Sequence, residues 1–429
     1  MKNRIIAVKD KIADLIKGGF LYILVGNTLT KMLTFISSII IVRLVSKEEF
    51  AYLSYSDNLY LYVIAISGFG MSSAILKYCG PQYKKEEDKA YFNLAIKGGF
   101  LVEFILSALI VLYVRIANIP FPEAKGLVNM MILYPAMNYV VATFQSYARA
   151  WFDNKVYAWI GFLQSAIALA AGIVFVKCIG IYGMVFARYI SMCICCIAGG
   201  SFVKKKIEKS KIVKIEYREK KKFISLSLSF MFASLFSMIM PINETFLINH
   251  ILRDEIISSN YKVAMLIPSQ TIFISNSIGI YFFPILNQIE NKKHLWKTIK
   301  RIEVLSVFLI GLITIVGIIF FPYVIKYVYG EKYIECIGLS NIYWIVYGIN
   351  SGFRLIALNL IPAFADAKVS ALVSIGSALM HAIACYLIVP TYGVYGAAMV
   401  LGIVYFITGC IYWIYIYKYC KNCGCMDRI

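Results

Sequence analysis

Residues 153–183, DNKVYAWIGFLQSAIALAAGIVFVKCIGIYG, and residues 366–396, DAKVSALVSIGSALMHAIACYLIVPTYGVYG, follow one pattern. A shift of 213 residues aligns the two stretches without a gap, and nine of the 31 positions are identical. The identical positions include Asp, Lys, Gly and Tyr residues, which a shared apolar composition does not explain. A repeat at about half the length of the chain predicts two halves built on one structural plan.

Long apolar segments alternate with short charged stretches along the whole chain. Twelve segments stand out, each near the ~20 residues that cross the hydrocarbon core of a bilayer. They cover residues 18–42, 52–76, 93–117, 124–147, 156–176, 181–203, 223–249, 259–285, 302–321, 334–357, 369–389 and 394–417. These runs are too long for barrel strands, and a backbone in hydrocarbon must close its own hydrogen bonds. We therefore expect an all-α membrane protein with about twelve transmembrane helices.

The basic residues indicate how these helices are oriented. Of the 43 Lys and Arg residues, 32 fall in the two termini and in the loops on the same side of the membrane. Nine fall on the other side, and Lys31 and Arg188 lie inside apolar segments. The positive-inside rule predicts both termini in the cytoplasm, with the protein in the cytoplasmic (inner) membrane. Because the inside loops account for the net charge of +20, we expect no nucleic-acid partner.

The repeat also predicts the domain organisation. Six apolar segments separate the two copies, so both halves share one topology and are parallel. We expect an N-terminal six-helix lobe at residues 1–203, a basic cytoplasmic linker at 204–222, a C-terminal six-helix lobe at 223–417 and a cytoplasmic tail at 418–429. Such repeats are typical of transporters whose site lies between the halves, which predicts a central cavity.

Cationic residues inside apolar segments are the first candidates for binding a cargo, because charge in hydrocarbon is costly. Lys31 lies near the centre of the first segment, on a polar stripe that includes Asn27. Arg188 lies inside the sixth segment, and Arg354 shares a face of the tenth with Asn350. A cavity lined by these groups suits an anionic cargo. The alternatives are packing or snorkelling for Lys31 and a cytoplasmic anchor for Arg354.

Two carboxylates are candidates for coupling transport to Na⁺ or H⁺. Glu244 follows Pro241 on one face of the seventh segment, and a proline there kinks the helix. The alternative is that Glu244 lies at the outer mouth of its helix. Glu103 lies near the middle of the third segment, where it could also neutralise a buried cation.

Residues that would carry enzymatic or metal chemistry are few. The three histidines are His250, His294 and His381, and no acidic residue neighbours the last of them. Cys420, Cys423 and Cys425 form a C-x-x-C-x-C tail that lacks the fourth ligand of a metal site, so we expect free thiols. The predicted segments leave no extracytoplasmic loop that is large enough to hold an active site. We expect a transporter without a cofactor or metal and not an enzyme.

Several short motifs along the chain are similar to those of one transporter family. Residues 27–45, NTLTKMLTFISSIIIVRLV, resemble its opening helix, although Phe50-Ala51-Tyr52 replaces the usual Tyr-Gly pair. Residues 260–264, NYKVA, resemble its Gly-Tyr-x-x-Ala element, and Pro284 in FFPILNQI matches the proline that ends its eighth helix. Residues 384–406, ACYLIVPTYGVYGAAMVLGIVYF, are similar to its penultimate-loop signature. These motifs resemble the polysaccharide flippase (oligosaccharide-lipid exporter) family, whose superfamily also holds multidrug and toxin extruders.

The resemblance implies a function. It implies that two lobes expose a central site to one side of the membrane at a time, which is alternating access. By this motion they would flip undecaprenyl-diphosphate-linked oligosaccharides to the outer leaflet for capsule, O-antigen or exopolysaccharide assembly. It also implies that Lys31, Arg188 and Arg354 contact the diphosphate or acidic sugars. The expected partners are the lipid-linked oligosaccharide, the bilayer, and a polysaccharide polymerase with other assembly proteins. Two alternatives stay open: a cation-coupled multidrug exporter of the same fold, and a membrane enzyme of polysaccharide assembly.

Overall fold

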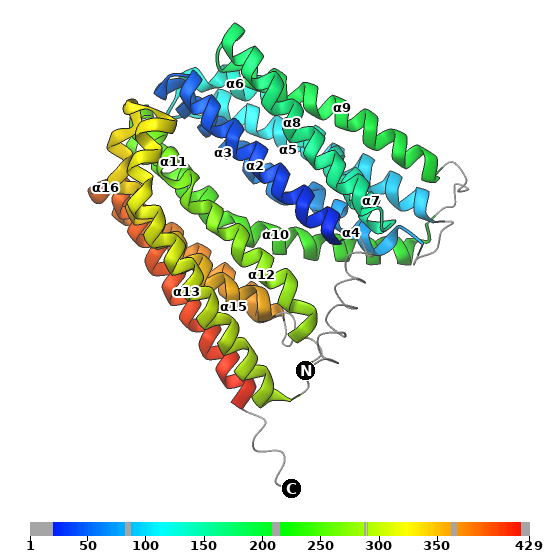
Figure 1. Ribbon diagram of the computed structural model, residues 1–429. Coiled ribbons are helices and arrows are strands. Elements are labelled where there is room, and N and C mark those ends of the chain that lie inside the picture. Colours follow the sequence, from blue (N-terminus) through cyan, green and yellow to red (C-terminus); the bar gives the residue numbers. More distant parts are fainter. Residues whose placement is uncertain are drawn as a thin grey trace. The chain divides into compact units, whose positions relative to one another are not determined.

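The structure, a computed structural model, describes residues 20–81, 87–207, 215–286, 289, 291–361 and 367–421. These residues are almost entirely helical, and no β-strand occurs among them (Figure 1). The prediction of an all-α membrane protein is therefore confirmed. Contacts between Cα atoms divide the chain into two compact units, residues 1–235 (unit 1) and 236–429 (unit 2), and each unit is described by itself.

Unit 1 contains the first eleven helices of the described chain and the start of the next. They are α2 (Phe20–Leu44), α3 (Lys47–Ile66), η1 (Gly68–Gly70), α4 (Met71–Tyr78), α5 (Asp88–Ile116), η2 (Pro122–Ala124), α6 (Lys125–Met130), η3 (Met131–Leu133), α7 (Tyr134–Ala150), α8 (Asn154–Ile179), α9 (Tyr182–Ile207) and the first part of α10 (Tyr217–Leu252). Of the predicted linker 204–222, the first residues extend α9 and the last ones begin α10. The predicted lobe limits stay a prediction.

Unit 2 contains the end of α10 and the remaining helices. They are α11 (Glu255–Leu266), η4 (Pro268–Gln270), α12 (Thr271–Leu286), α13 (Lys292–Val324), η5 (Ile325–Tyr329), η6 (Glu331–Cys336), α14 (Ile337–Ile349), η7 (Asn350–Arg354), α15 (Leu355–Leu360) and α16 (Ala367–Lys421). Two of these elements, η5 and η7, are single π-helical turns. Helix α16 is interrupted at Gly393, so it contains the last two predicted segments.

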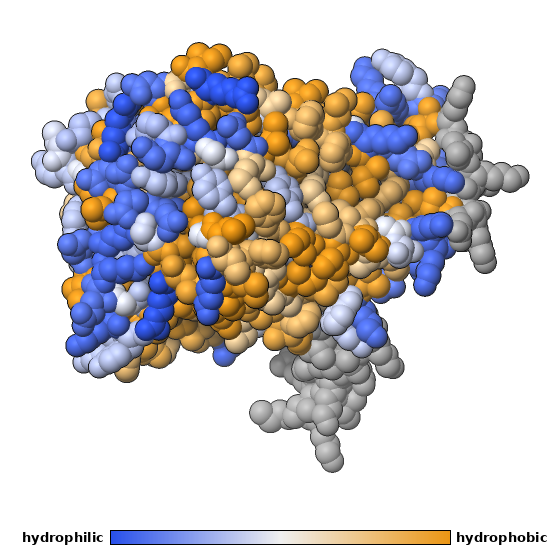
Figure 2. Space-filling model, turned by 90° about the horizontal axis from the view of Figure 1, so that it is seen from above, coloured by the Kyte–Doolittle hydropathy of each residue, from blue (hydrophilic) through white to orange (hydrophobic). Residues whose placement is uncertain are grey.

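The described residues of all twelve predicted segments fall on helices, but several segments are built from shorter pieces. Eight described helical stretches are each long and apolar enough to cross a membrane. A ninth is obtained when 217–236 and 238–252, bent by 49°, are counted as one span. On the face drawn in Figure 2, hydrophobic residues gather between two more hydrophilic regions. This is the surface expected of a protein embedded in a bilayer.

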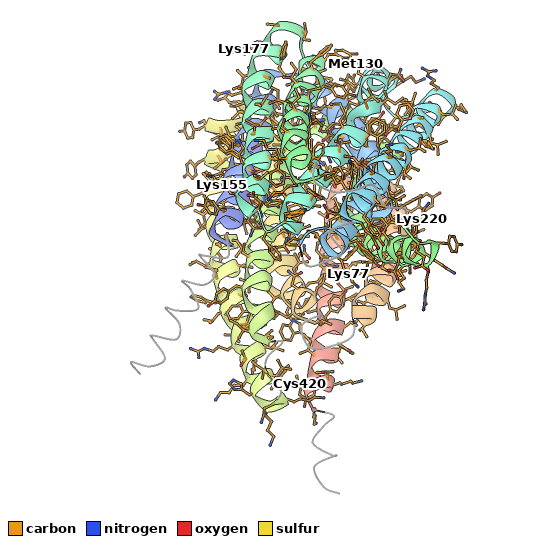
Figure 3. The ribbon with its side chains drawn as sticks, turned by 90° about the vertical axis from the view of Figure 1, so that its right-hand side faces the viewer. Lys77, Met130, Lys155, Lys177, Lys220 and Cys420 are labelled. Atoms are coloured by element: carbon orange, nitrogen blue, oxygen red, sulfur yellow. The ribbon has the colours of Figure 1, made fainter. Side chains whose placement is uncertain are left out.

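Four lysines of unit 1 lie toward opposite ends of its helices. Lys77, Lys155 and Lys220 lie toward one end, whereas Lys177 and Met130 lie toward the other (Figure 3). With both termini in the cytoplasm, the predicted segments place the first three lysines beside cytoplasmic loops and Lys177 beside an outer loop. The grouping is compatible with the predicted orientation, which stays a prediction.

Aromatic packing fixes the start of α10 in the core of unit 1. Phe223 is fully buried, and its ring lies 5.3 Å from the ring centroids of both Tyr78 and Tyr91. Beside this cluster, buried Asp88 accepts hydrogen bonds from the Tyr147 hydroxyl and from the Gly80 N–H. These contacts hold the start of α10 against α4 and α5.

The internal repeat is visible in the backbone as well as in the sequence. Gly180 has φ 64° and ψ −150°, and Gly393, at the equivalent position, has φ 57° and ψ −147°. A Cβ on Gly183 would lie 2.3 Å from the carbonyl carbon of Phe175. A Cβ on Gly396 would lie 2.8 Å from Ile388, the residue equivalent to Phe175. Both halves therefore turn between their last two helices in the same way. The repeated Asp366 lies outside the described residues.

Replacing either repeated glycine tests this shared turn. Gly180→Ala and Gly393→Ala are each expected to lower the free energy of unfolding by about 1–3 kcal/mol, because this backbone region is nearly restricted to glycine. The melting temperature of the purified full-length protein in detergent measures the effect. Gly376→Ala, in open space with ordinary helical geometry, is the matched control. Equal melting temperatures for all three variants would contradict the shared turn.

Candidate functional site

Unit 1 holds a cavity between α2, α8 and α9 whose mainly apolar lining includes several polar groups. Its volume is about 300 Å³, and most of its polar lining consists of hydroxyl and amide groups. These groups belong to Thr30, Thr34, Ser37, Gln164, Ser165 and Ser191. Such groups can exchange hydrogen bonds with a neutral polar molecule or with water.

Arg188 lines this cavity, but its charge is already paired. Its Nη1 and Nη2 lie 2.5 and 2.8 Å from the two carboxylate oxygens of Asp57, and its guanidinium lies 5.2 Å from the centre of the Tyr134 ring. A bidentate pair of this kind is strong and directional. Asp57 therefore neutralises Arg188.

Lys31 and Asn27 lie on α2 but do not line the cavity. Lys31 is exposed, and within the part of the chain that the structure describes it makes no hydrogen bond or ion pair. Asn27 accepts a hydrogen bond of 3.2 Å from the Tyr157 hydroxyl of α8. Lys31 is therefore a cation without a local counter-charge, whereas Asn27 takes part in helix packing.

Glu103 is fully buried on α5, beside a break in the second span. The residue is only 1% exposed, and its Oε1 accepts a hydrogen bond of 2.6 Å from the Gly68 N–H. No Lys, Arg or His pairs with it among the described residues.

In unit 2, Glu244 lies at the centre of a buried hydrogen-bond network. Its Oε1 accepts hydrogen bonds from the hydroxyls of Tyr343 (2.7 Å) and Tyr261 (3.2 Å). Its Oε2 lies 3.2 Å from Nε2 of His381, which also lies 3.4 Å from the Cys385 sulfur. Glu244 is 1% exposed and His381 is fully buried, and the depth of Glu244 in the bilayer stays a prediction.

His381 is the functional candidate that sequence reasoning missed. Its partner Glu244 lies 137 positions away, and nothing local in the sequence connects them. The rule that selected Lys31 could also have selected His381, because both are ionisable residues inside apolar segments, where such residues are costly.

Arg354 and Asn350 lie at the two ends of the π-helical turn η7. Arg354 is 5% exposed, and it donates hydrogen bonds of 3.0 Å from Nη1 to Asn350 Oδ1 and from Nε to Thr408 Oγ1. Its guanidinium lies 4.9 Å from the centre of the Tyr405 ring. No carboxylate contacts it in the described part of unit 2. Single π-turns inside helices are frequent at functional sites.

His, Cys, Asp and Glu side chains do not cluster as metal ligands in the described part of the chain. No group of three or more His, Cys, Asp or Glu residues there could hold a metal ion. Cys423 and Cys425 of the predicted thiol tail lie outside the described residues.

The Asp57–Arg188 pair can be tested by a double-mutant cycle. Asp57→Asn and Arg188→Gln are each expected to destabilise the protein by about 1–3 kcal/mol, less than a fully buried pair because the two side chains are 30% and 16% exposed. The double variant should lose less than the sum of the two, because neither charge is then left alone. Melting temperatures in detergent measure the effect. Strictly additive losses would show that the pair is not coupled.

Comparison with known proteins identifies the fold. A MOP superfamily transporter from Pyrococcus furiosus has a TM-score of 0.65 with 12% identity, covering 94% of each chain. An inward-facing multidrug resistance MATE family transporter has a TM-score of 0.62 with 15% identity, covering 93% of this chain and 98% of its own. A bent form of a Vibrio cholerae MATE transporter gives 0.58 with 12% identity, covering 96% and 98%.

A search of curated proteins finds no significant match. Residues 16–290 match the family described as polysaccharide biosynthesis protein. The match spans more than half of the chain and agrees with the resemblance seen in its motifs. The chain is a multi-pass membrane protein with the fold of the MOP superfamily transporters, and it belongs to the polysaccharide biosynthesis protein family.

Proposed function

We propose that the protein flips undecaprenyl-diphosphate-linked oligosaccharide repeat units across the cytoplasmic membrane by alternating access. The observation that carries the proposal is Arg354, a buried cation with no carboxylate in contact among the described residues. A buried charge without a counter-ion is costly, and an anionic cargo would compensate it. Lys31 supplies a second cation without a local counter-charge. The family match and the fold support transport of a polysaccharide precursor.

The proposal includes a place in the cell and a set of partners. The distribution of Lys and Arg supports an inner-membrane protein with both termini in the cytoplasm. The cargo arrives from cytoplasmic enzymes that build the lipid-linked repeat unit. A polysaccharide polymerase and other assembly proteins would receive it at the outer leaflet.

The Glu244–His381 pair is the proposed coupling group. A carboxylate and an imidazole 3.2 Å apart can share one proton. The net charge of the pair rises by one when the proton binds and falls by one when it leaves. The two tyrosine hydroxyls keep the carboxylate in place. A proton is therefore favoured over Na⁺ as the coupling ion at this position.

A cation-coupled multidrug exporter of the same fold is the second candidate. The MATE-type structures and the buried carboxylate Glu244 favour it. The uncompensated Lys31 and Arg354 count against it, because they would repel a cationic drug.

Lipid-linked glycans in the native host test the proposal directly. Deletion of the gene is expected to cause undecaprenyl-diphosphate-linked repeat units to accumulate and surface polymer to disappear, both measured by mass spectrometry. An external glycosidase should not reach the accumulated units, which separates failed flipping from failed polymerisation. Unchanged intermediates together with unchanged surface polymer would refute the flippase and favour the exporter.

Two cation variants test the cargo site. Lys31→Ala and Arg354→Ala are each expected to reduce flipping about tenfold or more at normal protein level, because each removes a charged contact. Lys177→Ala and Arg115→Ala, which remove basic residues at helix ends, are the matched controls. Glycosidase-accessible repeat units in complemented cells measure flipping. Full activity of both site variants would show that neither cation binds the cargo.

A third variant tests the coupling group. His381→Gln is expected to abolish the dependence of transport on a pH gradient in proteoliposomes, because glutamine cannot bind the proton. His250→Gln, at another histidine of unit 2, is the control. An unchanged pH dependence in His381→Gln would exclude the pair as the coupling group.

A further inference from the structure

The second span of unit 1 is interrupted by four consecutive residues in the left-handed backbone region. Ser67, Gly68, Phe69 and Gly70 have φ values of 48°, 56°, 56° and 74° between α3 and α4. For a residue other than glycine this region costs about 1–2 kcal/mol. Strain of this kind persists only where the surroundings impose it, and it concentrates at binding sites.

Close packing on both sides holds the turn in this conformation. A Cβ on Gly68 would lie 2.4 Å from the Tyr139 ring, and a Cβ on Gly70 would lie 2.1 Å from the carbonyl oxygen of Ser227 on α10. The Ser67 hydroxyl lies 2.8 Å from that of Ser72 across the break. The break is therefore a built feature of unit 1 and not a frayed helix end.

A buried carboxylate occupies this break, and one of its oxygens has no partner. Glu103 Oε1 accepts the 2.6 Å hydrogen bond from Gly68 N–H, whereas Oε2 has no hydrogen-bond partner among the described residues. Ser107 lies one helical turn further along the same face of α5. It is fully buried, and its hydroxyl also has no partner within that part of the chain.

The remaining groups at the break are backbone oxygens. The last carbonyls of α3 lose their helical donors where the helix ends, although Ile64 O accepts a bond of 3.1 Å from Ser67 N–H. The carboxyl end of a helix also carries a partial negative charge. Carboxylate, hydroxyl and carbonyl oxygens at a discontinuous transmembrane helix are the ligands that transporters use for Na⁺.

We propose that Glu103 Oε2, Ser107 Oγ and the carbonyls at the end of α3 bind one Na⁺ ion. The ion compensates the charge of a buried carboxylate, which pairs with no Lys, Arg or His in the described chain. It also gives a partner to Glu103 Oε2 and Ser107 Oγ, the two oxygens without a hydrogen bond. Its binding favours the strained turn, so it stabilises the broken form of the second span. The site concerns unit 1 alone and does not depend on the cargo proposed above.

One simpler explanation accounts for part of the geometry. Glu103 Oε1 caps the first N–H of the segment η1–α4, and a protonated Glu103 would be neutral without any ion. In that case its O–H would need an acceptor, and Oε2 has none among the described residues. The orphaned Ser107 hydroxyl would also stay unexplained.

Sodium binding to the purified full-length protein tests the site. The melting temperature is measured in NaCl, KCl and choline chloride at equal ionic strength, and ²²Na⁺ binding is measured in parallel. Wild type is expected to melt several degrees higher in NaCl, because a ligand that binds only the folded state stabilises it. Glu103→Gln keeps the bond to Gly68 N–H and should lower Na⁺ affinity about 100-fold or more. Ser107→Ala should lower it about tenfold.

Two matched variants serve as controls. Ser191→Ala removes a buried hydroxyl that bonds within its own helix, to Arg188 O. Glu303→Gln removes another carboxylate inside an apolar helix, in unit 2. Both should keep the Na⁺ effect.

Three outcomes would overturn the Na⁺ site. They are equal melting in the three salts, unchanged ²²Na⁺ binding in Glu103→Gln, or a pH-dependent and Na⁺-independent stabilisation that Glu103→Gln removes. The last outcome would identify Glu103 as a protonated cap. None of these results bears on lipid-linked glycans, so failure here is distinct from failure of the flippase.

Discussion

A charged side chain in hydrocarbon costs several kcal/mol unless another group compensates its charge. The polar interior of this protein follows from that constraint. The chain meets it in different ways. Arg188 is paired with Asp57 by two bonds. Glu244 is surrounded by two tyrosine hydroxyls and an imidazole. Glu103 and Arg354 are compensated only in part, and these incomplete sites are where ligands are proposed.

The kind of compensation differs among the three cations that were selected from the sequence. Arg188 was selected from the sequence because it lies inside an apolar segment, by the same argument as Lys31 and Arg354. The structure distinguishes them, because only Arg188 has a carboxylate in contact among the described residues. An anionic cargo gains little from a guanidinium that is already bound on both nitrogens. The positive character expected of the binding region therefore depends on Lys31 and Arg354.

Much of the fold could be predicted from the sequence, because the bilayer imposes a length and an apolar composition on every span. The described residues of all twelve predicted segments fall on helices. The breaks were harder to predict, since a left-handed turn at Ser67–Gly70 or a π-turn at Asn350–Arg354 depends on contacts with other helices. The partners of the charges were missed for the same reason. Asp57 and Arg188 are 131 positions apart, and no periodicity connects them.

The repeated turn at Gly180 and Gly393 has a consequence for how the two halves diverged. At both positions the backbone dihedral angles lie in a region that residues with a side chain avoid. If the halves descend from one duplicated gene, substitutions could accumulate freely around these glycines but not at them. The neighbours have changed from Ile181 to Val394, while the glycines and the following Tyr-Gly pair are the same. The ancestry of the molecule would then be preserved longest in its backbone dihedral angles, after most of the shared side chains have been lost.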